Sequence, residues 1–472
     1  METILVVGGG LVGSLLSVYL ARQGHRVHLF DRYPDFRNAK APLGKSINLT
    51  ICERGFTALD RVGAGDLVRA ISVPCYGRVV HAVDGSVEYQ PYGNRREAIY
   101  SVSRNNLNRT LLMLALEQPS LICHFEHKCL EVFLDQPAVT FKDLRSGELS
   151  HWRGDRLFGA DGAHSAVRQG MQRAQRFNLV QEPLDQGYKE LDLPPAAEGW
   201  VLEGNAIHIW PRGHYMLIGF PNLDRSFTLA LHMPFEGEPS FASVRTQEDV
   251  LRLFERSFPD VLPLLPNLGG DFLSRPEATM VTIRCSPWTY RDKVLLVGDA
   301  AHAIVPSYGQ GANAGFEDCS VLADCLAGSD GDWSAAFARF EAARKPNAEA
   351  IADLALEHFH ELRDLVGDAS FQLRKKVERR INELFPDRYM PLYSLVSFTN
   401  MTYVEALRQD RAQRDLIDRV LALPGILERL DSEEIQEAIG GLMDQEPKRS
   451  AELAIRPARM IRDHGMTPAE FP

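Results

Sequence analysis

The sequence predicts an α/β fold in which a nucleotide-binding domain is joined to a largely β second lobe and a helical C-terminal part. Three observations predict this organisation: a glycine-rich strand–turn–helix near the N-terminus, alternating polar and apolar residues in the middle of the chain, and helical periodicity beyond residue 334. The expected boundaries are 1–180 and 291–335 for the nucleotide-binding domain, 181–290 for the β lobe and 336–472 for the helical region.

Composition and charge exclude several classes of function. With 472 residues and 45% hydrophobic content, the chain can bury a large core. Its net charge of −11 argues against a nucleic-acid-binding protein, which needs basic side chains to neutralise phosphates. Seven scattered cysteines without zinc-type spacing predict reduced thiols, no metal site and a cytoplasmic protein. We also expect no signal peptide and no transmembrane anchor, because no apolar run is long enough to span a bilayer.

The N-terminal segment has the pattern of a Rossmann-like dinucleotide-binding unit. A short apolar strand leads into Gly8, Gly10 and Gly13, spaced as GxGxxG, then into a helix and a second strand that ends at Asp31. In this context the glycines let the backbone approach a pyrophosphate, and the carboxylate accepts a hydrogen bond from the adenosine ribose. Because the chain has only one such motif, we expect one dinucleotide that stays bound, whereas a nicotinamide cofactor would bind elsewhere or briefly.

The stretch that follows predicts a hairpin and a helix. Residues 76–93 alternate around an Asp-Gly turn, with Arg78 and Tyr92 on either side of it. A helix is expected at 101–116, with Arg104 in its first turns. Spacing alone leaves open whether these arginines are merely solvated or bind a ligand.

Two later motifs complete a three-part signature. A strand is followed by an Asp161-Gly162 turn and a helix, and a further apolar strand runs into Gly298-Asp299. The second motif leaves a carboxylate at the carboxyl end of its strand, where open α/β sheets bind ligands. The loop after it leads into a helix that begins at Gly311, whose free N–H groups would stabilise a negative charge.

The remaining segments are assigned more coarsely. Residues 180–290 alternate at positions such as His208 and Trp210, which predicts a sheet with one covered face that could roof a cofactor. The helical region beyond it is expected to break at Pro346. The charged tail beyond Arg408 matches no pattern that we can assign.

The order of the three motifs resembles the single-component flavin-dependent aromatic monooxygenases, the para-hydroxybenzoate hydroxylase class. Within that class the chain is similar to the kynurenine 3-monooxygenase family as far as about residue 410, through the segments SINL, YGR, QPYG, SRNNLNRTLL, GADGAHSAVR, QGYKEL, AIHIWPRG, PNLDRSFTLAL, GDAAHAIVP and PLYSLVSF. The resemblance implies non-covalent FAD, NADPH as a transient co-substrate, and O2. The implied reaction is hydroxylation of L-kynurenine to 3-hydroxykynurenine in tryptophan degradation, and a homodimer is compatible with it.

The resemblance also assigns residues to sites. It implies that Arg78, Tyr92 and Tyr393 hold the amino-acid end of the substrate, and His358 stands where the family has an asparagine. Pro306 and Tyr308 are expected in the catalytic loop, and His232, Ser307 and Ala312 in the pocket for the substrate ring. The residues expected to contact FAD are Gly8, Gly10, Val12, Gly13, Asp31, Arg32, Arg104, Asp161, Gly162, Gly298, Asp299, Gly311, Ala312 and Asn313.

Departures from the family pattern cluster around the ring pocket. His232 stands where the family has a phenylalanine, and Ser307, Ala312 and His358 make the pocket more polar and emptier. Because one altered contact can discriminate substrates strongly, hydroxylation of a ring-substituted kynurenine or related aromatic amino acid in a secondary-metabolite pathway stays an alternative. Two further alternatives fit less well. A flavin-dependent halogenase would carry a WxWxIP stretch, which none of the five tryptophans provides, and a non-catalytic flavoprotein would not need the substrate-binding set.

Overall fold

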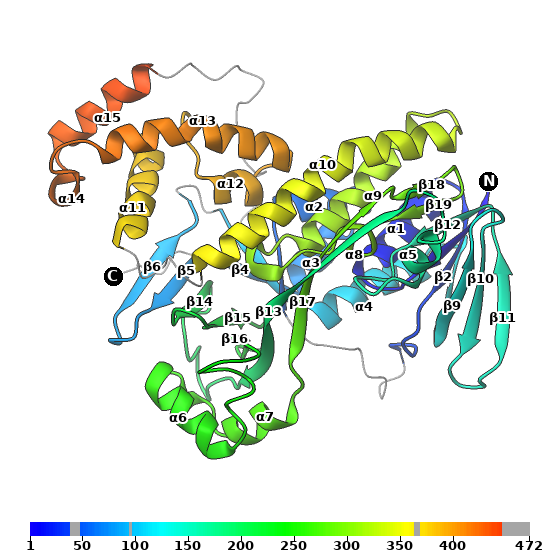
Figure 1. Cartoon of the computed structure of the whole chain (residues 1–472), viewed down its shortest axis with the longest axis horizontal. Helices are drawn as coiled ribbons and strands as arrows, with labels where there is room; N and C mark the ends of the chain where they lie inside the picture. Colours follow the sequence, from blue (N-terminus) through cyan, green and yellow to red (C-terminus); the bar gives the residue numbers. More distant parts are fainter. Residues whose placement is uncertain (38–47, 94–96, 363–368, 446–472) are drawn as a thin grey trace.

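A computed structural model describes residues 1–37, 48–93, 97–362 and 369–445. It confirms the predicted α/β architecture with a second sheet and a helical C-terminal part (Figure 1). Three-stranded sheet β11-β10-β9 lies at one edge of the molecule and the last helices at the other. The strands at that edge are β9 (His127–Phe133), β10 (Ala138–Asp143) and β11 (Leu149–Arg153).

A six-stranded sheet, in the order β18-β19-β12-β1-β2-β8, forms the nucleotide-binding part. All of its neighbouring strands pair in parallel except β18 with β19. The carboxyl ends of parallel strands meet at one edge of a sheet, so the glycine motif after β1, the Asp-Gly turn after β12 and the Gly-Asp motif after β19 become neighbours. The strands are β1 (Thr3–Val7), β2 (Arg26–Phe30), β8 (Leu121–His124), β12 (Arg156–Gly159), β18 (Thr289–Tyr290) and β19 (Val294–Leu296).

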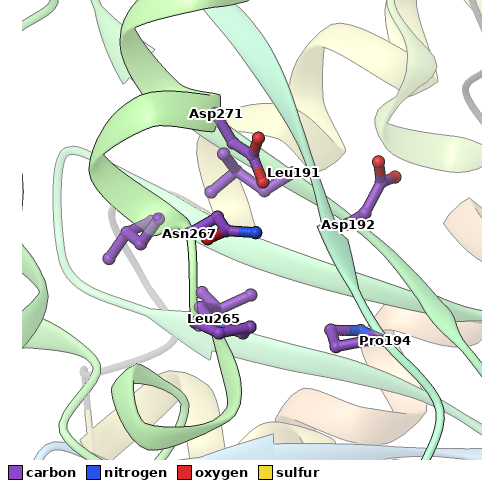
Figure 2. A pocket seen from close by; sticks show the side chains of 8 residues that line it. Leu191, Asp192, Pro194, Leu265, Asn267 and Asp271 are labelled. Carbon is purple, nitrogen blue, oxygen red and sulfur yellow. The ribbon is translucent and has the colours of Figure 1, made fainter.

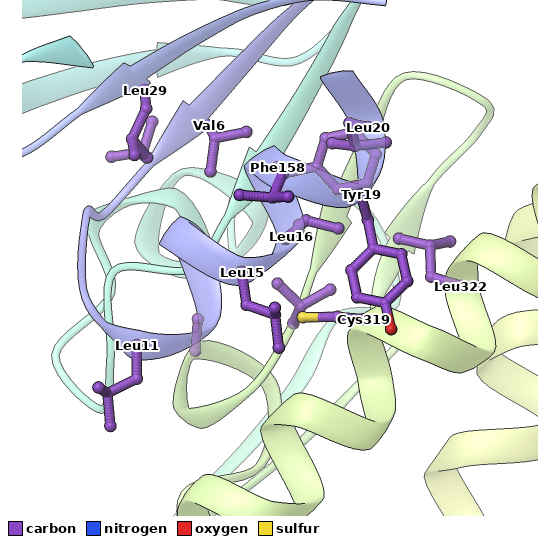
Figure 3. Close-up of a cluster of buried hydrophobic side chains, with 14 of the residues drawn as sticks. Val6, Leu11, Leu15, Leu16, Tyr19, Leu20, Leu29, Phe158, Cys319 and Leu322 are labelled. Carbon is purple, nitrogen blue, oxygen red and sulfur yellow. The ribbon is translucent and has the colours of Figure 1, made fainter. Parts of the chain in front are cut away.

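The main core lies between this sheet and two helices, α1 (Leu11–Arg22) and α9 (Gly311–Ala327). Figure 3 shows Leu15, Leu16 and Tyr19 of α1 close to Cys319 and Leu322 of α9. Ten of the twelve residues of α1 are buried, so the helix is packed against its neighbours on nearly all sides. This packing fixes where the helix begins, at the glycine motif.

A seven-stranded sheet, in the order β17-β13-β16-β15-β14-β5-β6, forms the second lobe. The predicted hairpin belongs to it, since β5 pairs in parallel with β14. The segment 1–180 therefore contributes strands to both large sheets, and the proposed domain boundaries stay a prediction. The strands are β5 (Gly77–His81), β6 (Val87–Pro91), β13 (Asn178–Leu193), β14 (Ala206–Pro211), β15 (Met216–Pro221), β16 (Phe227–Pro234) and β17 (Ala278–Ser286).

The expectation that only one face of this sheet is covered is wrong. Trp210 and Leu217 pack with the buried residues of α6 (Gln247–Ser257) and α7 (Leu268–Ser274), on the side where Figure 1 places these helices. On the other face, Ile207 and Ile209 pack with residues of the C-terminal helices. The central strands are buried on both faces because helices from two distant parts of the chain cover them, which alternation in the strands alone cannot indicate.

Two predicted boundaries also differ from the structure. Residues 101–103 belong to β7 (Ile99–Ser103), which pairs with β3 (Asn48–Ile51) and β4 (Val73–Cys75), so α4 (Arg104–Leu116) begins later than expected. Pro346 does not break α10 (Trp333–His360). The helix passes through it while its buried face packs on α9 and on α13 (Tyr403–Leu421).

The unassigned tail forms helices with a small core of their own. Ile417 and Val420 of α13 pack with Ile435 and Ile439 of α15 (Glu433–Gln445), and with Val377 of α11 (Ala369–Leu384). No helix in the described part of the chain is long and apolar enough to cross a membrane. The helices are α11 (Ala369–Leu384), α12 (Leu392–Ser397), α13 (Tyr403–Leu421), α14 (Ile426–Arg429) and α15 (Glu433–Gln445). The other short elements are α2 (Glu53–Arg61), α3 (Gly65–Ala70), α5 (Ala166–Met171), α8 (Asp299–His302), η1 (Leu262–Leu264) and η2 (Pro306–Tyr308).

Ile439→Ala tests the packing of the tail. Ile439 is fully buried, and a buried isoleucine-to-alanine change typically costs about 2–5 kcal/mol through the cavity it leaves. We expect faster hydrogen exchange in α13 and α15 and a lower unfolding temperature, whereas Glu437→Ala, an exposed position on the same helix, should leave both unchanged. Equal protection in the two variants would contradict this packing.

Candidate functional site

The glycine motif brings the ends of β1 and β12 into close contact. Gly8 has φ +106°, and a Cβ atom there would lie 2.4 Å from the carbonyl oxygen of Ala160. A Cβ atom at Gly13 would lie 1.8 Å from the carbonyl oxygen of Gly8. Gly10, in contrast, has open space around the position of its missing side chain, at the N-terminus of α1. Two of the glycines are thus required by packing, and the third leaves room for a ligand beside a helix N-terminus.

Asp31 is held beside this motif by backbone donors. Its carboxylate accepts hydrogen bonds from the N–H of Gly9 at 2.6 Å and of Tyr33 at 2.7 Å. Burial raises the pKa of Asp31, and these hydrogen bonds oppose the rise. A carboxylate can accept about four hydrogen bonds, so capacity is left for a ribose hydroxyl. Arg32 next to it is exposed and contacts Tyr33.

Val12 fills the space between the first and third motifs. Its side chain lies 3.0 Å from the position of a Cβ atom at Gly298, which has φ +57°, and 2.5 Å from such a position at Gly315. Asp299 follows Gly298 at the start of α8 and is half-buried. Among the described residues its carboxylate has no hydrogen-bond or ion-pair partner, so it can accept from a ligand hydroxyl.

The N-terminus of α9 offers backbone donors rather than a side chain. The first intrahelical bond runs from Ala314 N to Gln310 O at 2.8 Å, so the N–H groups of residues 311–313 precede the helical ladder. The Asn313 side chain donates to Thr50 O at 2.9 Å and to Gly309 O at 2.8 Å, and accepts from Cys52 N at 3.0 Å. This amide therefore ties two loops together, and any cofactor contact here falls to the backbone.

The Asp161-Gly162 turn is organised by its own helix. The Asp161 carboxylate accepts from Ser165 Oγ at 2.5 Å and from Ala166 N at 2.7 Å, at the start of α5. Arg168 donates to the Ala300 carbonyl at 2.8 Å and so links this turn to the third motif. A cofactor contact at this turn stays a prediction. Because the Asp161 carboxylate is already bonded within the turn, the backbone at Gly162 would make the contact. Arg104, the first residue of α4, is exposed, and its cofactor role also stays a prediction.

Beneath the third motif lies a buried ionic group that the sequence did not reveal. Asp318 accepts hydrogen bonds from Gly298 N at 2.9 Å, from His302 Nε2 at 2.6 Å and from Arg344 Nε at 2.7 Å. Burial acts to raise the pKa of Asp318, but His302 and Arg344 outweigh it and hold the pKa at about 2. The carboxylate is therefore ionised and fixes the backbone of the Gly298 turn.

This group continues toward the C-terminal helices. Arg344 also pairs with Glu317, which lies 2.5 Å from Arg54. Arg54 in turn donates to the Met401 carbonyl at 2.5 Å and lies 4.0 Å from the centre of the Tyr403 ring. In the sequence, Asp318 is one more acidic residue after the third motif, and nothing there indicates its partners.

A tyrosine cluster from three separate segments forms the candidate substrate site. The ring centroids of Tyr92 and Tyr393 are 5.4 Å apart, those of Tyr308 and Tyr393 5.5 Å, and those of Tyr308 and His358 4.9 Å. Burial raises the pKa of Tyr393 to about 12 and those of Tyr92 and Tyr308 well above the usual range. All three hydroxyls therefore stay protonated and can donate to an anion.

Arg78 adds a positive charge to this cluster. Its Nε donates to Gln90 Oε1 at 2.8 Å across the β5–β6 pair. Burial dominates the pKa of Tyr393, and the nearby Arg78 guanidinium opposes the rise. No carboxylate among the described residues forms an ion pair with Arg78, which leaves the guanidinium available to an anionic ligand. The structure thus brings together Arg78, Tyr92, Tyr308, His358 and Tyr393.

The residues predicted for the ring pocket are not alike. His232 shares a face of the seven-stranded sheet with Arg78 through the strand registers, and burial lowers its pKa to about 4. In the described structure the Nδ1 of His232 is buried without a hydrogen-bond partner. The ring centroid of His232 lies 5.5 Å from that of Tyr188. Ser307, however, donates to the Ala355 carbonyl at 2.5 Å. The Ser307 hydroxyl is therefore already paired within the protein, and its place in the ring pocket stays a prediction. Pro306 is exposed and Ala312 packs on the main core.

A separate hollow lies on the other side of the second lobe. Figure 2 shows it between β13 and α7, with Asp192 and Asp271 at its sides. None of the predicted site residues lines it. The tyrosine cluster, which gathers several side chains of matching chemistry, is the better candidate for a functional site.

Comparison with known proteins adds three findings. A family model described as FAD binding domain matches residues 1–355. Kynurenine 3-monooxygenase of Flavobacterium johnsoniae is 45% identical over 94% of this chain and 99% of the relative, and that of Myxococcus xanthus is 42% identical over 96% and 94%. The structure of 2-methyl-3-hydroxypyridine-5-carboxylic acid oxygenase, 20% identical, superposes with a TM-score of 0.63 over 78% of this chain and 94% of that one, which shows a shared fold.

Gly10→Ala tests the cofactor cradle. The new methyl group meets no protein atom within 4 Å, so the fold should be unaffected, but it would project where a pyrophosphate approaches α1. We expect an unchanged unfolding temperature of the cofactor-free protein and at least about a tenfold weaker FAD affinity, the effect of one close contact of about 1.4 kcal/mol. Gly270→Ala is the control, since that position on α7 is also open and has no left-handed φ, but lies in the second lobe away from the glycine motif. Full FAD affinity in Gly10→Ala would contradict the cradle.

Asp318→Asn tests the buried ionic group. Removing one partner of a buried pair typically costs about 3–5 kcal/mol, whereas Asp324→Asn on the same helix removes only a surface pair with Arg61. Because the folded pKa of Asp318 is lowered to about 2, its stabilisation is present above about pH 4 and is lost as the pH falls toward 2. Unfolding measured against pH should therefore show a shallower acid branch in Asp318→Asn only. An acid branch identical to that of the wild type would sink this assignment.

Proposed function

Because the chain belongs to the kynurenine 3-monooxygenase family of FAD-binding proteins, we propose that it hydroxylates L-kynurenine to 3-hydroxykynurenine. One atom of O2 enters the aromatic ring beside the aniline amine, the other leaves as water, and NADPH supplies the two electrons. We further propose a cytoplasmic enzyme, in keeping with seven free cysteines.

The observation that carries the proposal is the convergence of Arg78, Tyr92 and Tyr393. They come from β5, the end of the hairpin and α12, yet their side chains meet at one face of the second sheet. The Arg78 guanidinium, which has no carboxylate partner among the described residues, and two protonated phenols are the donors that a substrate carboxylate needs. A simple flavin-binding protein has no use for such a set.

The motif residues fit FAD. The open position at Gly10 and the N-terminus of α1 would hold the pyrophosphate, Asp31 the ribose, Asp299 the ribityl hydroxyls and the N–H groups of residues 311–313 the flavin ring. Bound FAD supplies the redox chemistry, the acceptance of electrons from NADPH and the activation of O2. The protein supplies orientation and a site from which water is excluded.

The residues proposed to bind the substrate orient its aromatic ring by holding the amino-acid end of the molecule. Binding energy at Arg78 and the tyrosines fixes the amino-acid end, so the ring enters the reaction in a defined position. Buried apolar residues of the same cluster, such as Ile207, Ile218 and Phe359, keep water away from it. No protein nucleophile is needed.

A second candidate function rests on His232. A buried imidazole without a hydrogen-bond partner costs roughly 1–3 kcal/mol, which a polar substituent on the substrate ring would offset. The alternative is therefore hydroxylation of a ring-substituted kynurenine, with the hydroxyl or amino group of that substituent bonded to His232.

Arg78→Met tests the carboxylate site. Loss of a charge-assisted pair worth about 1.5–3 kcal/mol should raise the KM for L-kynurenine roughly 10- to 100-fold, while the FAD content stays normal. Arg173→Met, which removes an arginine with a 70% exposed side chain, serves as the control. An unchanged KM in Arg78→Met would mean that the carboxylate binds elsewhere.

His232→Phe distinguishes the two substrates. The change removes the unpaired nitrogen and fills space, so activity with L-kynurenine should be kept or raised. Activity with 5-hydroxykynurenine and other ring-substituted analogues should fall at least about tenfold, as expected for the loss of one buried hydrogen bond. If the wild type prefers plain L-kynurenine over every substituted analogue, the second candidate function is wrong.

A further inference from the structure

A histidine in the last turn of α10 and the glutamate just after the helix form a pair beside the tyrosine cluster. Nδ1 of His358 lies 3.4 Å from Oε2 of Glu361. The His358 ring centroid is 4.9 Å from that of Tyr308 and 6.3 Å from that of Tyr393. The pair thus borders the site proposed for the amino-acid end of the substrate. Glu361 itself is not among the residues proposed to bind the substrate carboxylate.

The charges of the two partners fix the direction of their hydrogen bond. Burial lowers the pKa of His358, so its imidazole is neutral near pH 7. Burial acts to raise the pKa of Glu361, but the hydrogen bond to His358 and the nearby Lys375 ammonium outweigh it, and the pKa is lowered. An ionised carboxylate can only accept, so the hydrogen of the neutral ring is on Nδ1. Nε2 is then an acceptor, and it has no partner among the described residues.

This acceptor and this carboxylate lie close to a cation. The Arg78 guanidinium contributes to the pKa values of both His358 and Glu361, but no ion pair joins Arg78 to Glu361 in the described structure. The site therefore presents a positive group beside a negative one. A zwitterionic amino acid matches both, whereas an acid without the amino group would leave Nε2 without a hydrogen-bond donor.

We propose that Glu361 is a positioning residue that holds His358 with Nε2 toward the substrate ammonium, and that this pair selects aromatic α-amino acids over the same acids without the amino group. The inference rests on the proposed function, which puts the substrate carboxylate at Arg78. His358 would touch the substrate directly, and Glu361 would act through His358 and through its charge.

The test compares L-kynurenine with 4-(2-aminophenyl)-4-oxobutanoate, which lacks only the α-amino group. Kd is measured by calorimetry with the FAD-loaded enzyme, and KM and kcat from NADPH oxidation. We expect the wild type to bind L-kynurenine at least about tenfold more tightly, and Glu361→Leu to lose this preference by weakening L-kynurenine alone. Glu361→Gln, which keeps an acceptor oxygen, should restore part of it. The kcat should change little, because the pair does not touch the reacting ring.

Glu357→Leu is the matched control, since it removes an exposed carboxylate from the same turn of α10 and should keep the wild-type preference. If Glu361→Leu weakens both ligands equally, Glu361 only supports the local structure and the inference is wrong. If the wild type binds both ligands equally well, the inference is wrong while the proposed function stands. If neither ligand binds the wild type, the proposed function fails and the inference fails with it.

Discussion

The contact between Asp318 and Arg344 supports most of the site. The carboxylate binds the backbone of the Gly298 turn on one side, and the guanidinium reaches Glu317 and through it Arg54 on the other. Removing two charges from water is costly, so such a group is stable only when every member is paired and hydrogen-bonded. Here the pairing ties α9 and α10 to α2 and to the loop before α13, and these elements carry the residues on both sides of the proposed flavin position.

The second constraint is the parallel pairing of β1, β12 and β19. It brings three turns that are far apart in the sequence to one edge of the sheet. The glycines at this edge are needed for different reasons. Gly8 and Gly13 are excluded from bearing side chains by neighbouring backbone, whereas Gly10 lies in open space that only a ligand would fill. Within one motif, Gly8 and Gly13 are therefore required by packing, and Gly10 would be required by ligand binding.

The motifs that would bind the cofactor could be predicted from the sequence, whereas the buried interactions that support them could not. The three motifs were recognisable because each joins a strand to a turn with glycine at fixed positions, and such local patterns survive without knowledge of the fold. Asp318, Arg344 and Arg54 escaped notice because their meaning lies in partners 26 and 263 residues away in the chain. The covered second face of the large sheet and the unbroken helix at Pro346 escaped for the same reason, since packing by distant helices decided both.

The C-terminal helices therefore contribute side chains to the proposed substrate site. Tyr393 lies on α12, His358 and Glu361 on and just after the end of α10, and α11 brings Lys375 close to Glu361. Arg78 comes from a strand nearly 300 residues earlier, so the positive and the negative side of the site belong to different layers of the fold. Arg78 is hydrogen-bonded to Gln90 and Glu361 to His358, and no ion pair joins Arg78 to Glu361 in the described structure. A site that keeps opposite charges apart in this way costs free energy when empty, and a ligand that carries both charges recovers it. The separation of the two charges, more than either charge alone, is what would make the site selective for an amino acid.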